Sequence, residues 1–318
     1  MKILVSGGLG FIGHEVVRYL AGHDILVIDS MTNYDFIPQE QMLKLFQLRT
    51  GSNLNQVPTR NIDIRDRQAV NEAVINFQPD VVIHLASFPR QKVVLQNPSV
   101  ASEVMSTGLI NLLEASKGVA SKFVYISSSM VYGDFDDMVT EEQECNPRGQ
   151  YAIMKLMGEK LVADYSKYFD YTIIRPSAVY GPRDVEDRVL SKFMMGCLRG
   201  ETITVKGAEE VLDFTYVTDT AKGIVLATTQ SCNYNVYNIT RCQDRPISLK
   251  IAAETALKIV GKGKIKITDR DLNFPSRGRL SIERARNDLG YSPQIDFEKG
   301  CLLYLDWIKN SEYWNEQI

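Results

Sequence analysis

The chain has 318 residues, of which 44% are hydrophobic and 24% charged, and its formal net charge at pH 7 is −3. These values are typical of a globular protein with one large or two modest domains, and they exclude a strongly basic nucleic-acid binder and a membrane-spanning chain. The five scattered cysteines and three separate histidines predict neither a disulfide framework nor a metal site, so we expect a cytoplasmic protein.

The first thirty residues are the most informative stretch. Met1–Ser6 is an apolar run of buried-strand length, residues 7–13 are a glycine-rich loop, and residues 14–20 have helical spacing. A second apolar strand at 24–28 is followed by Asp29. Strand, glycine loop, helix, strand and terminal acid in this order are typical of a dinucleotide-binding unit.

The residues of this unit predict which dinucleotide it binds. Gly7 allows a tight turn off the strand, Gly10 lets the backbone approach a pyrophosphate, and Gly13 lets the helix pack close to the sheet. Unpaired N–H groups at the start of the helix attract the anion. Asp29 can accept hydrogen bonds from both hydroxyls of an adenosine ribose, whereas a 2′-phosphate would meet its negative charge. We therefore predict NAD, and not NADP, as the cofactor.

Strands and helices then alternate along the chain. Further strands are expected at 59–63, 80–84, 122–128, 171–175 and 234–239, and helices at 38–48, 65–77, 98–117, 151–169 and 218–229. This alternation predicts an α/β fold of the Rossmann type, in which helices cover both faces of a doubly wound parallel sheet.

The alternation is interrupted after Arg175, where prolines and a glycine follow closely. Beyond that point the sequence predicts one helix and short strands within 184–213, a strand at 264–267, and helices at 248–260, 281–289 and 297–309. We expect a smaller mixed α/β lobe over the carboxyl ends of the strands, where ligands bind in such folds. The predicted domains are an NAD-binding domain of residues 1–175 and 214–240, and a substrate lobe of residues 176–213 and 241–318.

Tyr151 and Lys155 are the second informative feature. Residues at i and i+4 share one helix face, and this helix follows the predicted strand that ends at Ser128. A phenol has a pKa of about 10, but a nearby ammonium group favours the phenolate, as does the positive charge of an oxidised nicotinamide. The pair therefore predicts a general base, with a serine hydroxyl at the strand end bonding the same substrate oxygen.

Together these segments resemble the extended short-chain dehydrogenase/reductases of the NAD-dependent nucleotide-sugar epimerase/dehydratase family, in particular UDP-glucose 4-epimerases. The resemblance covers nearly the whole chain. It is carried by Ser6–Gly13, Asp29, Asp63-Ile64, His84–Ser87, Ser127–Gly133, Tyr151–Lys155, Arg175–Pro182, Asp213–Asp219 and Ala285–Pro293. It implies a nucleotide-diphosphate sugar as the partner, and a homodimer formed through the helices at about 98–117 and 151–169.

The resemblance also implies roles for single residues. Ser128 would bind the substrate hydroxyl, Tyr151 would be the base and Lys155 would bind the cofactor ribose, while Asp63-Ile64 would lie near the adenine and Leu85-Ala86 near the inner ribose or nicotinamide. The expected cofactor-binding residues are Gly7, Gly10, Phe11, Ile12, Gly13, Asp29, Ser30, Asp63, Ile64, Leu85, Ala86, Ser87, Tyr151, Lys155 and Pro176. The expected substrate-binding residues are Ser128, Ser129, Ala178, Arg188 and Arg277.

The segment before Val131-Tyr132-Gly133 separates reaction types within the family. Sugar 4,6-dehydratases have an acidic pair there, which handles the loss of water. This chain has Ser129 and Met130 instead, and neither side chain can replace a carboxylate as a general acid or base. The sequence therefore favours reversible oxidation at C4, as in 4-epimerases, over dehydration.

The chain also departs from the family pattern. It has Met105 and Ala178 where asparagine is common, and Leu212 where arginine is common. Because the last two positions often serve the nucleotide diphosphate, phosphate contacts are expected from other arginines. The candidates are Arg183, Arg188, Arg277 and Arg279, of which we favour Arg188 and Arg277.

The leading hypothesis is an NAD-dependent nucleotide-sugar 4-epimerase. One alternative is a C4 oxidase or reductase of a nucleotide-activated hexose or heptose, with similar residues but net redox change. Another is a non-catalytic NAD-binding protein, which the intact set of Ser128, Tyr151 and Lys155 disfavours. The nucleotide base and the sugar stay open.

Overall fold

The computed structural model describes residues 1–32, 37–54 and 56–311. Its centre is a seven-stranded sheet in which every neighbouring pair of strands is parallel. The strands are, in spatial order, β10 (Val236–Ile239), β6 (Asp170–Pro176), β5 (Lys122–Ile126), β4 (Val81–His84), β1 (Lys2–Ser6), β2 (Asp24–Asp29) and β3 (Thr59–Asn61). The chain runs outward from β1 to β3 and returns to place β4 on the other side of β1. This confirms the predicted Rossmann arrangement and puts a topological switch point between β1 and β4.

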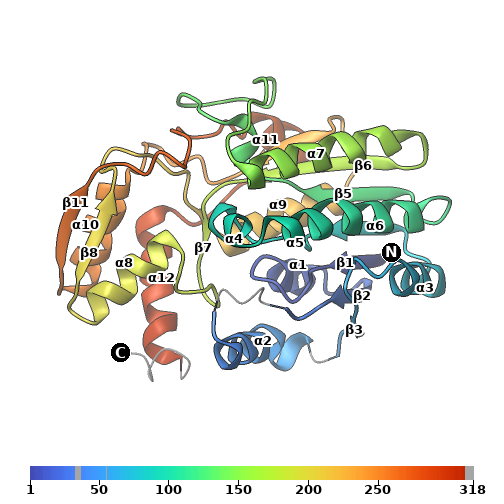
Figure 1. Cartoon of the computed structure of the whole chain (residues 1–318), viewed down its shortest axis with the longest axis horizontal. Helices are drawn as coiled ribbons and strands as arrows, with labels where there is room; N and C mark the ends of the chain where they lie inside the picture. The colour runs from blue at the N-terminus through green and yellow to red at the C-terminus, as the bar shows by residue number, and fades with distance from the viewer. Residues whose placement is uncertain (33–36, 55, 312–318) are drawn as a thin grey trace.

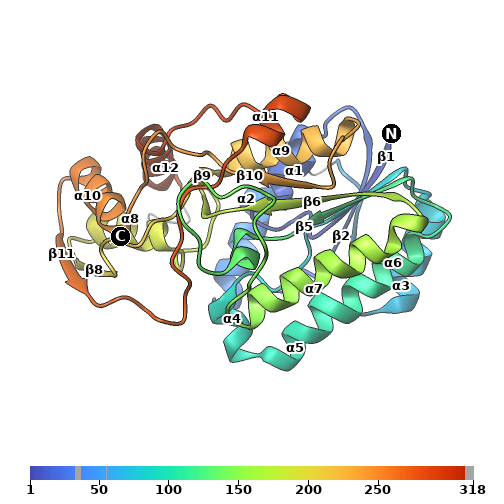
Figure 2. The same ribbon diagram turned by 90° about the horizontal axis from the view of Figure 1, so that it is seen from above.

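Helices cover both faces of the sheet, as Figure 2 shows. One face carries α3 (Arg67–Phe77), α5 (Pro98–Ser102), the π-helical segment η1 (Glu103–Gly108), α6 (Leu109–Ser116), α7 (Gln150–Asp164) and the short 3₁₀ segment η3 (Tyr165–Lys167). The other face carries α1 (Gly13–Tyr19), α9 (Val217–Thr229) and α11 (Glu283–Leu289). The central strands are buried on both sides, for example at Ile3, Leu4 and Val5, which explains their continuous apolar sequences.

A smaller group of elements lies beside the sheet, on the left in Figure 1. It contains α8 (Val189–Leu198), α10 (Leu249–Val260), α12 (Phe297–Asn310) and a two-stranded parallel sheet of β8 (Thr202–Lys206) and β11 (Lys264–Thr268). A second small parallel sheet pairs β7 (Val179–Tyr180) with β9 (Thr215–Tyr216). These elements share a hydrophobic core that includes Phe193, Ala252 and Cys301. Residues 312–318 of the predicted substrate lobe lie outside the described residues.

Several elements differ from the sequence-based expectation. The helix predicted at 98–117 is interrupted by η1, where Gly108 packs so closely against Ile64 that an added Cβ would lie 2.6 Å from its side chain. The helix predicted at 38–48 is α2 (Gln39–Leu54), which departs from helical geometry at Gly51. The short helix α4 (Gln91–Gln96), the 3₁₀ turn η2 (Ser129–Tyr132) and the β7–β9 pair were not expected, because so few residues show no readable period. No helix in the described ranges is long and apolar enough to cross a membrane.

Candidate functional site

A cavity lies at the switch point, at the carboxyl ends of the strands. The predicted cofactor-binding residues that line it are Gly7, Gly10, Phe11, Asp29, Ser30, Asp63, Ile64, Leu85, Ala86 and Ser87. They come from the glycine loop after β1, the end of β2, the turn after β3 and the end of β4, so four separate segments converge here. The other predicted cofactor residues, Ile12, Gly13, Tyr151, Lys155 and Pro176, lie outside this lining.

The glycine loop has the geometry that its sequence predicts. Gly7 has φ +74°, and a Cβ there would lie 2.5 Å from the backbone nitrogen of Ala86. A Cβ on Gly13 would lie 2.2 Å from the carbonyl oxygen of Gly7, so helix α1 can begin against the loop only with glycine at this position. Within the described ranges, the amides of Phe11 and Ile12 have no hydrogen-bond partner, which leaves them available to an anion.

Asp29 closes the other side of the loop. Its carboxylate accepts hydrogen bonds from the backbone amides of Leu9 (3.0 Å) and Met31 (2.9 Å). Burial raises the pKa of Asp29, while these two amides act in the opposite direction. Free amides at the loop, together with an acidic acceptor at the end of β2, fit the pyrophosphate and ribose of NAD.

Helix α2 contributes residues to this cavity that sequence reasoning missed. Met42, Phe46 and Arg49 line it. The Arg49 guanidinium is buried and donates to the carbonyl oxygens of Leu9 (3.4 Å) and Arg183 (2.9 Å). It thereby joins the glycine loop to the segment after β7. Residues 31–58 have no regular hydrophobic period, so only the folded chain reveals this placement.

Tyr151, Lys155 and Ser128 lie together at the ends of α7 and β5. The Ser128 hydroxyl accepts a hydrogen bond from the Met130 amide (3.2 Å) and lies close enough to the Tyr151 phenol to lower its pKa. The Lys155 ammonium nitrogen lies 5.9 Å from the centre of the Tyr151 ring and donates to the carbonyl oxygen of Ile126 (2.7 Å). The three predicted side chains are therefore brought together by the fold.

The electrostatic environment of these groups is dominated by burial. Burial raises the pKa of Tyr151, whereas the positive charge of Arg188 and the bond from Ser128 lower it. Burial also lowers the pKa of Lys155 to about 7, opposed by the negative charge of Glu159. Both groups thus favour their neutral forms more than they would in water.

The start of α7 is oriented by a residue that the sequence did not indicate. The side-chain oxygen of Gln91, on α4, accepts a hydrogen bond from the Tyr151 amide (3.0 Å). Gln91 also packs against Gly149, where φ is +86° and an added Cβ would lie 2.1 Å from the side-chain nitrogen Nε2 of Gln91. Helix α4 therefore fixes where α7 begins. A helix of six residues is too short to be predicted from its hydrophobic spacing.

The four candidate arginines separate into two pairs. Arg183 donates to the Leu48 carbonyl oxygen (2.8 Å), and Arg279 forms an ion pair with Asp137 (2.5 Å), so both hold the fold together. Arg188 lines the cavity and forms a 3.6 Å ion pair with Asp184.

Arg277 is placed beside the catalytic segment. Its guanidinium nitrogen Nη1 lies 3.4 Å from the sulfur of Met130. Burial lowers the pKa of Arg277 to about 10. Of the two favoured arginines, Arg277 thus lies beside η2 and Arg188 lies in the lining of the switch-point cavity. Ser129 is buried in the 3₁₀ turn η2, and Ala178, with φ +36°, precedes β7.

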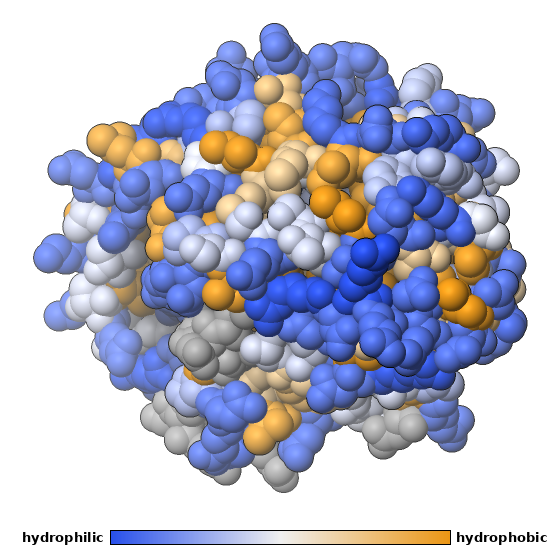
Figure 3. Space-filling model, turned by 45° about the vertical axis from the view of Figure 1, so that its right-hand side comes forward, coloured by the Kyte–Doolittle hydropathy of each residue, from blue (hydrophilic) through white to orange (hydrophobic). Residues whose placement is uncertain are grey.

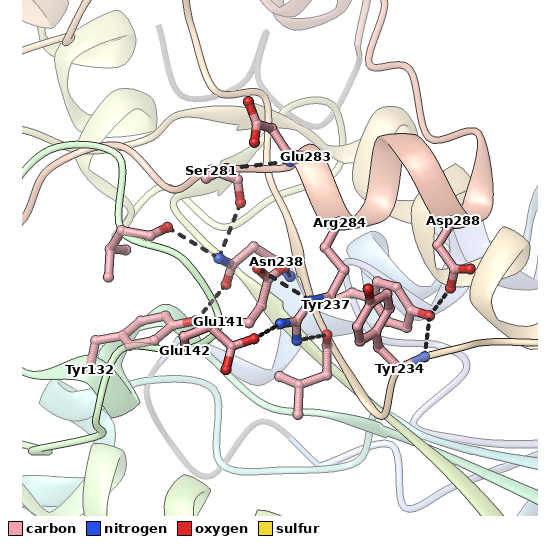
Figure 4. Close-up of polar contacts among 12 residues, drawn as sticks. Tyr132, Glu141, Glu142, Tyr234, Tyr237, Asn238, Ser281, Glu283, Arg284 and Asp288 are labelled. Carbon is pink, nitrogen blue, oxygen red and sulfur yellow. Dashed lines mark hydrogen bonds and ion pairs between the residues drawn. The ribbon is translucent and has the colours of Figure 1, made fainter.

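The loop between the two catalytic segments is fixed to the sheet edge by polar contacts, shown in Figure 4. The Tyr132 hydroxyl donates to the Asn238 side-chain oxygen (2.8 Å), and the Asn238 amide donates to Glu141 (2.8 Å). Arg284 on α11 is paired with Glu142 from the same loop. Residues 134–149 thus lie against β10 and α11, which holds η2 in place after Ser128.

The chain was compared with known proteins. The family model described as "NAD dependent epimerase/dehydratase family" matches residues 3–240. A putative UDP-glucose 4-epimerase of Methanocaldococcus jannaschii is 29% identical over 97% of this chain and 99% of its own length. A dTDP-glucose 4,6-dehydratase of Shigella flexneri is 26% identical over 100% of this chain and 95% of its own.

The solved structures give the same picture. The UDP-glucuronic acid 4-epimerase of Bacillus cereus, in complex with UDP-glucuronic acid and NAD, has a TM-score of 0.87 and 28% identity, and it covers 98% of this chain and 99% of its own. The relatives therefore include both 4-epimerases and 4,6-dehydratases, and the reaction has to be inferred from the residues at the site.

Proposed function

Because the chain belongs to the NAD-dependent epimerase/dehydratase family, we propose that it is a nucleotide-sugar 4-epimerase that oxidises C4 of its substrate transiently. The family confirms NAD as the cofactor. The observation that carries the choice of reaction is the pair Ser129-Met130 directly after Ser128, since neither residue supplies the carboxylate chemistry that removal of water requires.

The proposed roles follow from the placement of three side chains. Tyr151 removes the proton of the 4-hydroxyl, and the Ser128 hydroxyl beside the phenol binds the same substrate oxygen. Lys155 holds the cofactor ribose and favours the phenolate through its charge. When bound, NAD would supply reversible hydride transfer at C4 of the substrate.

The proposed cofactor site uses the cavity at the switch point. The amides of Phe11 and Ile12 would bind the pyrophosphate, Asp29 the adenosine ribose, and Asp63 with Ile64 the adenine side. Leu85, Ala86, Ser87 and Pro176 would contact the inner ribose and nicotinamide. We also propose domain boundaries close to the sequence expectation, because β10 belongs to the large sheet whereas β8 and β11 do not. The exception is α11, which was predicted in the substrate lobe but packs on the large sheet.

We expect NAD to bind more tightly than NADP, because the partly buried carboxylate of Asp29 would meet the 2′-phosphate of NADP with a like charge. Isothermal titration calorimetry with both dinucleotides measures the difference. Asp29→Asn is the matched variant, since it keeps the size of the side chain and removes its charge. It should reduce the difference in affinity between NAD and NADP. Tighter NADP binding to the wild-type protein would contradict the assignment of Asp29.

The substrate is proposed to be a nucleotide-diphosphate sugar. Two phosphates favour forked guanidinium donors. Arg188 and Arg277 are the candidates, because the charge of Arg188 acts on Tyr151 and Arg277 lies beside Met130. Ser129 and Ala178 would contribute further contacts from either side of the sugar.

We expect no 4-keto-6-deoxy sugar from any nucleotide hexose, because Ser129 and Met130 cannot act as the acid and base of dehydration. Incubation with UDP-, GDP-, CDP- and dTDP-sugars, followed by NMR of the products, tests the proposed function and this exclusion together. A 4-epimer without net NADH is the expected product. Stoichiometric NADH with an oxidised sugar would instead support the alternative C4 oxidase, and a 4-keto-6-deoxy product would refute the exclusion.

We expect a homodimer formed through the helical segments 98–116 and α7. Ile110 on α6 and Ile153 on α7 expose 38% and 53% of their surface, and Figure 3 shows hydrophobic patches among hydrophilic side chains on the face it presents. Light scattering at micromolar concentration should give twice the monomer mass, and Ile110→Glu/Ile153→Glu should shift it toward the monomer. Exposed Leu272, on another segment, provides a control variant, Leu272→Glu, that should leave the mass unchanged.

A further inference from the structure

Ser127, which precedes the catalytic serine, belongs to a buried polar cluster that the proposed mechanism does not use. Its hydroxyl donates to Oε1 of Glu159 on α7 at 2.5 Å. The same carboxylate accepts two hydrogen bonds from Arg175 on β6, at 2.9 Å and 2.6 Å. All three residues are at most 5% exposed. A charged cluster of this kind in the interior calls for a reason beyond stability, because well-packed apolar residues would often stabilise the fold equally well.

The cluster ties the two catalytic elements together. Glu159 is one helical turn after Lys155, so both side chains lie on the same face of α7. Lys155 donates to the carbonyl oxygen of Ile126, and Glu159 accepts from the adjacent Ser127. Two consecutive residues at the end of β5 are therefore bonded to two consecutive turns of α7. These bonds fix the distance between the strand end that carries Ser128 and the helix that carries Tyr151.

The charge of Glu159 also acts on Lys155. The groups that face the Lys155 ammonium are Tyr151 and Glu159 from α7, Tyr125 from β5 and His84 from β4. Burial lowers the pKa of His84 to about 3, so this imidazole is neutral, and burial raises the pKa of Tyr125. Glu159 is thus the anionic neighbour that opposes the loss of the lysine proton.

We propose that Glu159 is a positioning residue for catalysis: through Ser127 it holds the strand end that carries Ser128 against the helix that carries Tyr151, and through its charge it keeps Lys155 as an ammonium group. Arg175 neutralises the carboxylate and lies over the Tyr132 ring, with its guanidinium carbon 4.7 Å from the ring centre, so the cluster also connects to η2. This inference rests on the proposed roles of Ser128, Tyr151 and Lys155.

The test uses the full-length, NAD-loaded protein and two variants that probe the cluster differently. Ser127→Ala removes the hydroxyl and keeps the ion pair, whereas Glu159→Gln/Arg175→Met removes both charges together, so that no unpaired charge stays buried. Ser116→Ala is the matched control, because Ser116 is also a fully buried serine that bonds a carbonyl oxygen, that of Leu112, but on α6. The first readout is an NMR titration of ¹³Cε-labelled lysine, with the Lys155 signal assigned by Lys155→Met.

The proposal makes separate predictions for the variants. The Lys155 titration should move to lower pH in the double variant and stay in place in Ser127→Ala and Ser116→Ala. With a substrate identified by the nucleotide-sugar panel, kcat should fall roughly 10- to 100-fold in the double variant and roughly 10-fold in Ser127→Ala, with KM nearly unchanged. Ser116→Ala should leave both parameters as in the wild type.

The opposite results overturn the proposal. An unchanged Lys155 titration in the double variant excludes the charge effect, and an unchanged kcat in Ser127→Ala excludes the positioning effect. If the double variant does not fold, Ser127→Ala alone decides, since its ion pair is intact. Failure of the proposed function would appear differently, as full activity of Tyr151→Phe, while the NMR titration would still report whether Glu159 and Lys155 are coupled.

Discussion

Replacing Tyr151 by phenylalanine is expected to lower kcat roughly 10²- to 10⁴-fold, the range that a positioned general base contributes. The substitution removes one oxygen from a side chain whose ring is partly buried at the start of α7, so the fold and the cofactor site should be retained. The loss corresponds to about 3–5 kcal/mol of activation free energy. The measurement is single-turnover reduction of bound NAD⁺ by an accepted nucleotide sugar.

The pH profile identifies the group that is lost. Because burial raises the pKa of Tyr151, the wild-type rate should increase with pH as the phenol ionises. Burial lowers the pKa of Lys155 to about 7, below that of Tyr151, so above about pH 7 the loss of the ammonium charge offsets the gain in phenolate, and the rate should become level before it falls at still higher pH. Tyr151→Phe should lose the rising limb. A near wild-type rate with an unchanged profile in this variant would show that Tyr151 is not the base.

Two neighbouring substitutions provide the controls for this experiment. Ser128→Ala should lower the rate less than Tyr151→Phe, because it removes one hydrogen bond and leaves the base in place. Lys155→Met should weaken NAD binding as well as the rate, since its ammonium group serves both the ribose and the phenol in the proposed mechanism. The three variants therefore separate the base from the groups that assist it.

Replacing Arg175 alone by methionine is expected to lower the free energy of unfolding by about 3–5 kcal/mol. The Arg175 and Glu159 side chains are 6% and 5% exposed, and their charged atoms approach to 2.6 Å. Removing the arginine leaves the carboxylate of Glu159 buried without its counter-charge. Urea denaturation measures the loss, and the double variant Glu159→Gln/Arg175→Met should recover most of it.

An exposed ion pair supplies the control for burial. Lys258 and Glu298 lie 3.0 Å apart, but their side chains are 75% and 61% exposed. Lys258→Met should therefore change the free energy of unfolding by less than about 1 kcal/mol. If Arg175→Met lowers the free energy of unfolding no more than this control does, the buried ion pair contributes little to stability. The placement of Ser127 must then come from packing.

The sequence by itself determined the architecture and ten of the 21 residues that line the cavity at the switch point. The apolar runs of β1, β2, β4, β5 and β6 are buried on both faces, so their patterns are long and unambiguous. Gly7 and Gly13 could be assigned from the spacing of the glycine loop, and the constraint at Gly13 is local, because a Cβ there would meet the carbonyl oxygen of Gly7. The helix spacing of Tyr151 and Lys155 also follows from local geometry alone. For these features the neighbours in the chain are the neighbours in space.

Only the tertiary structure decided which distant residues complete the site. Arg49 reaches the glycine loop from α2, Gln91 holds the start of α7, and Arg175 meets Glu159 from another strand. Of the four candidate arginines, Arg183 and Arg279 are occupied by backbone and carboxylate partners that are far away in the sequence. Such contacts depend on how helices and loops pack over the sheet. No period or spacing records them, because the free energy that selects them comes from burial and pairing between segments that the sequence keeps apart.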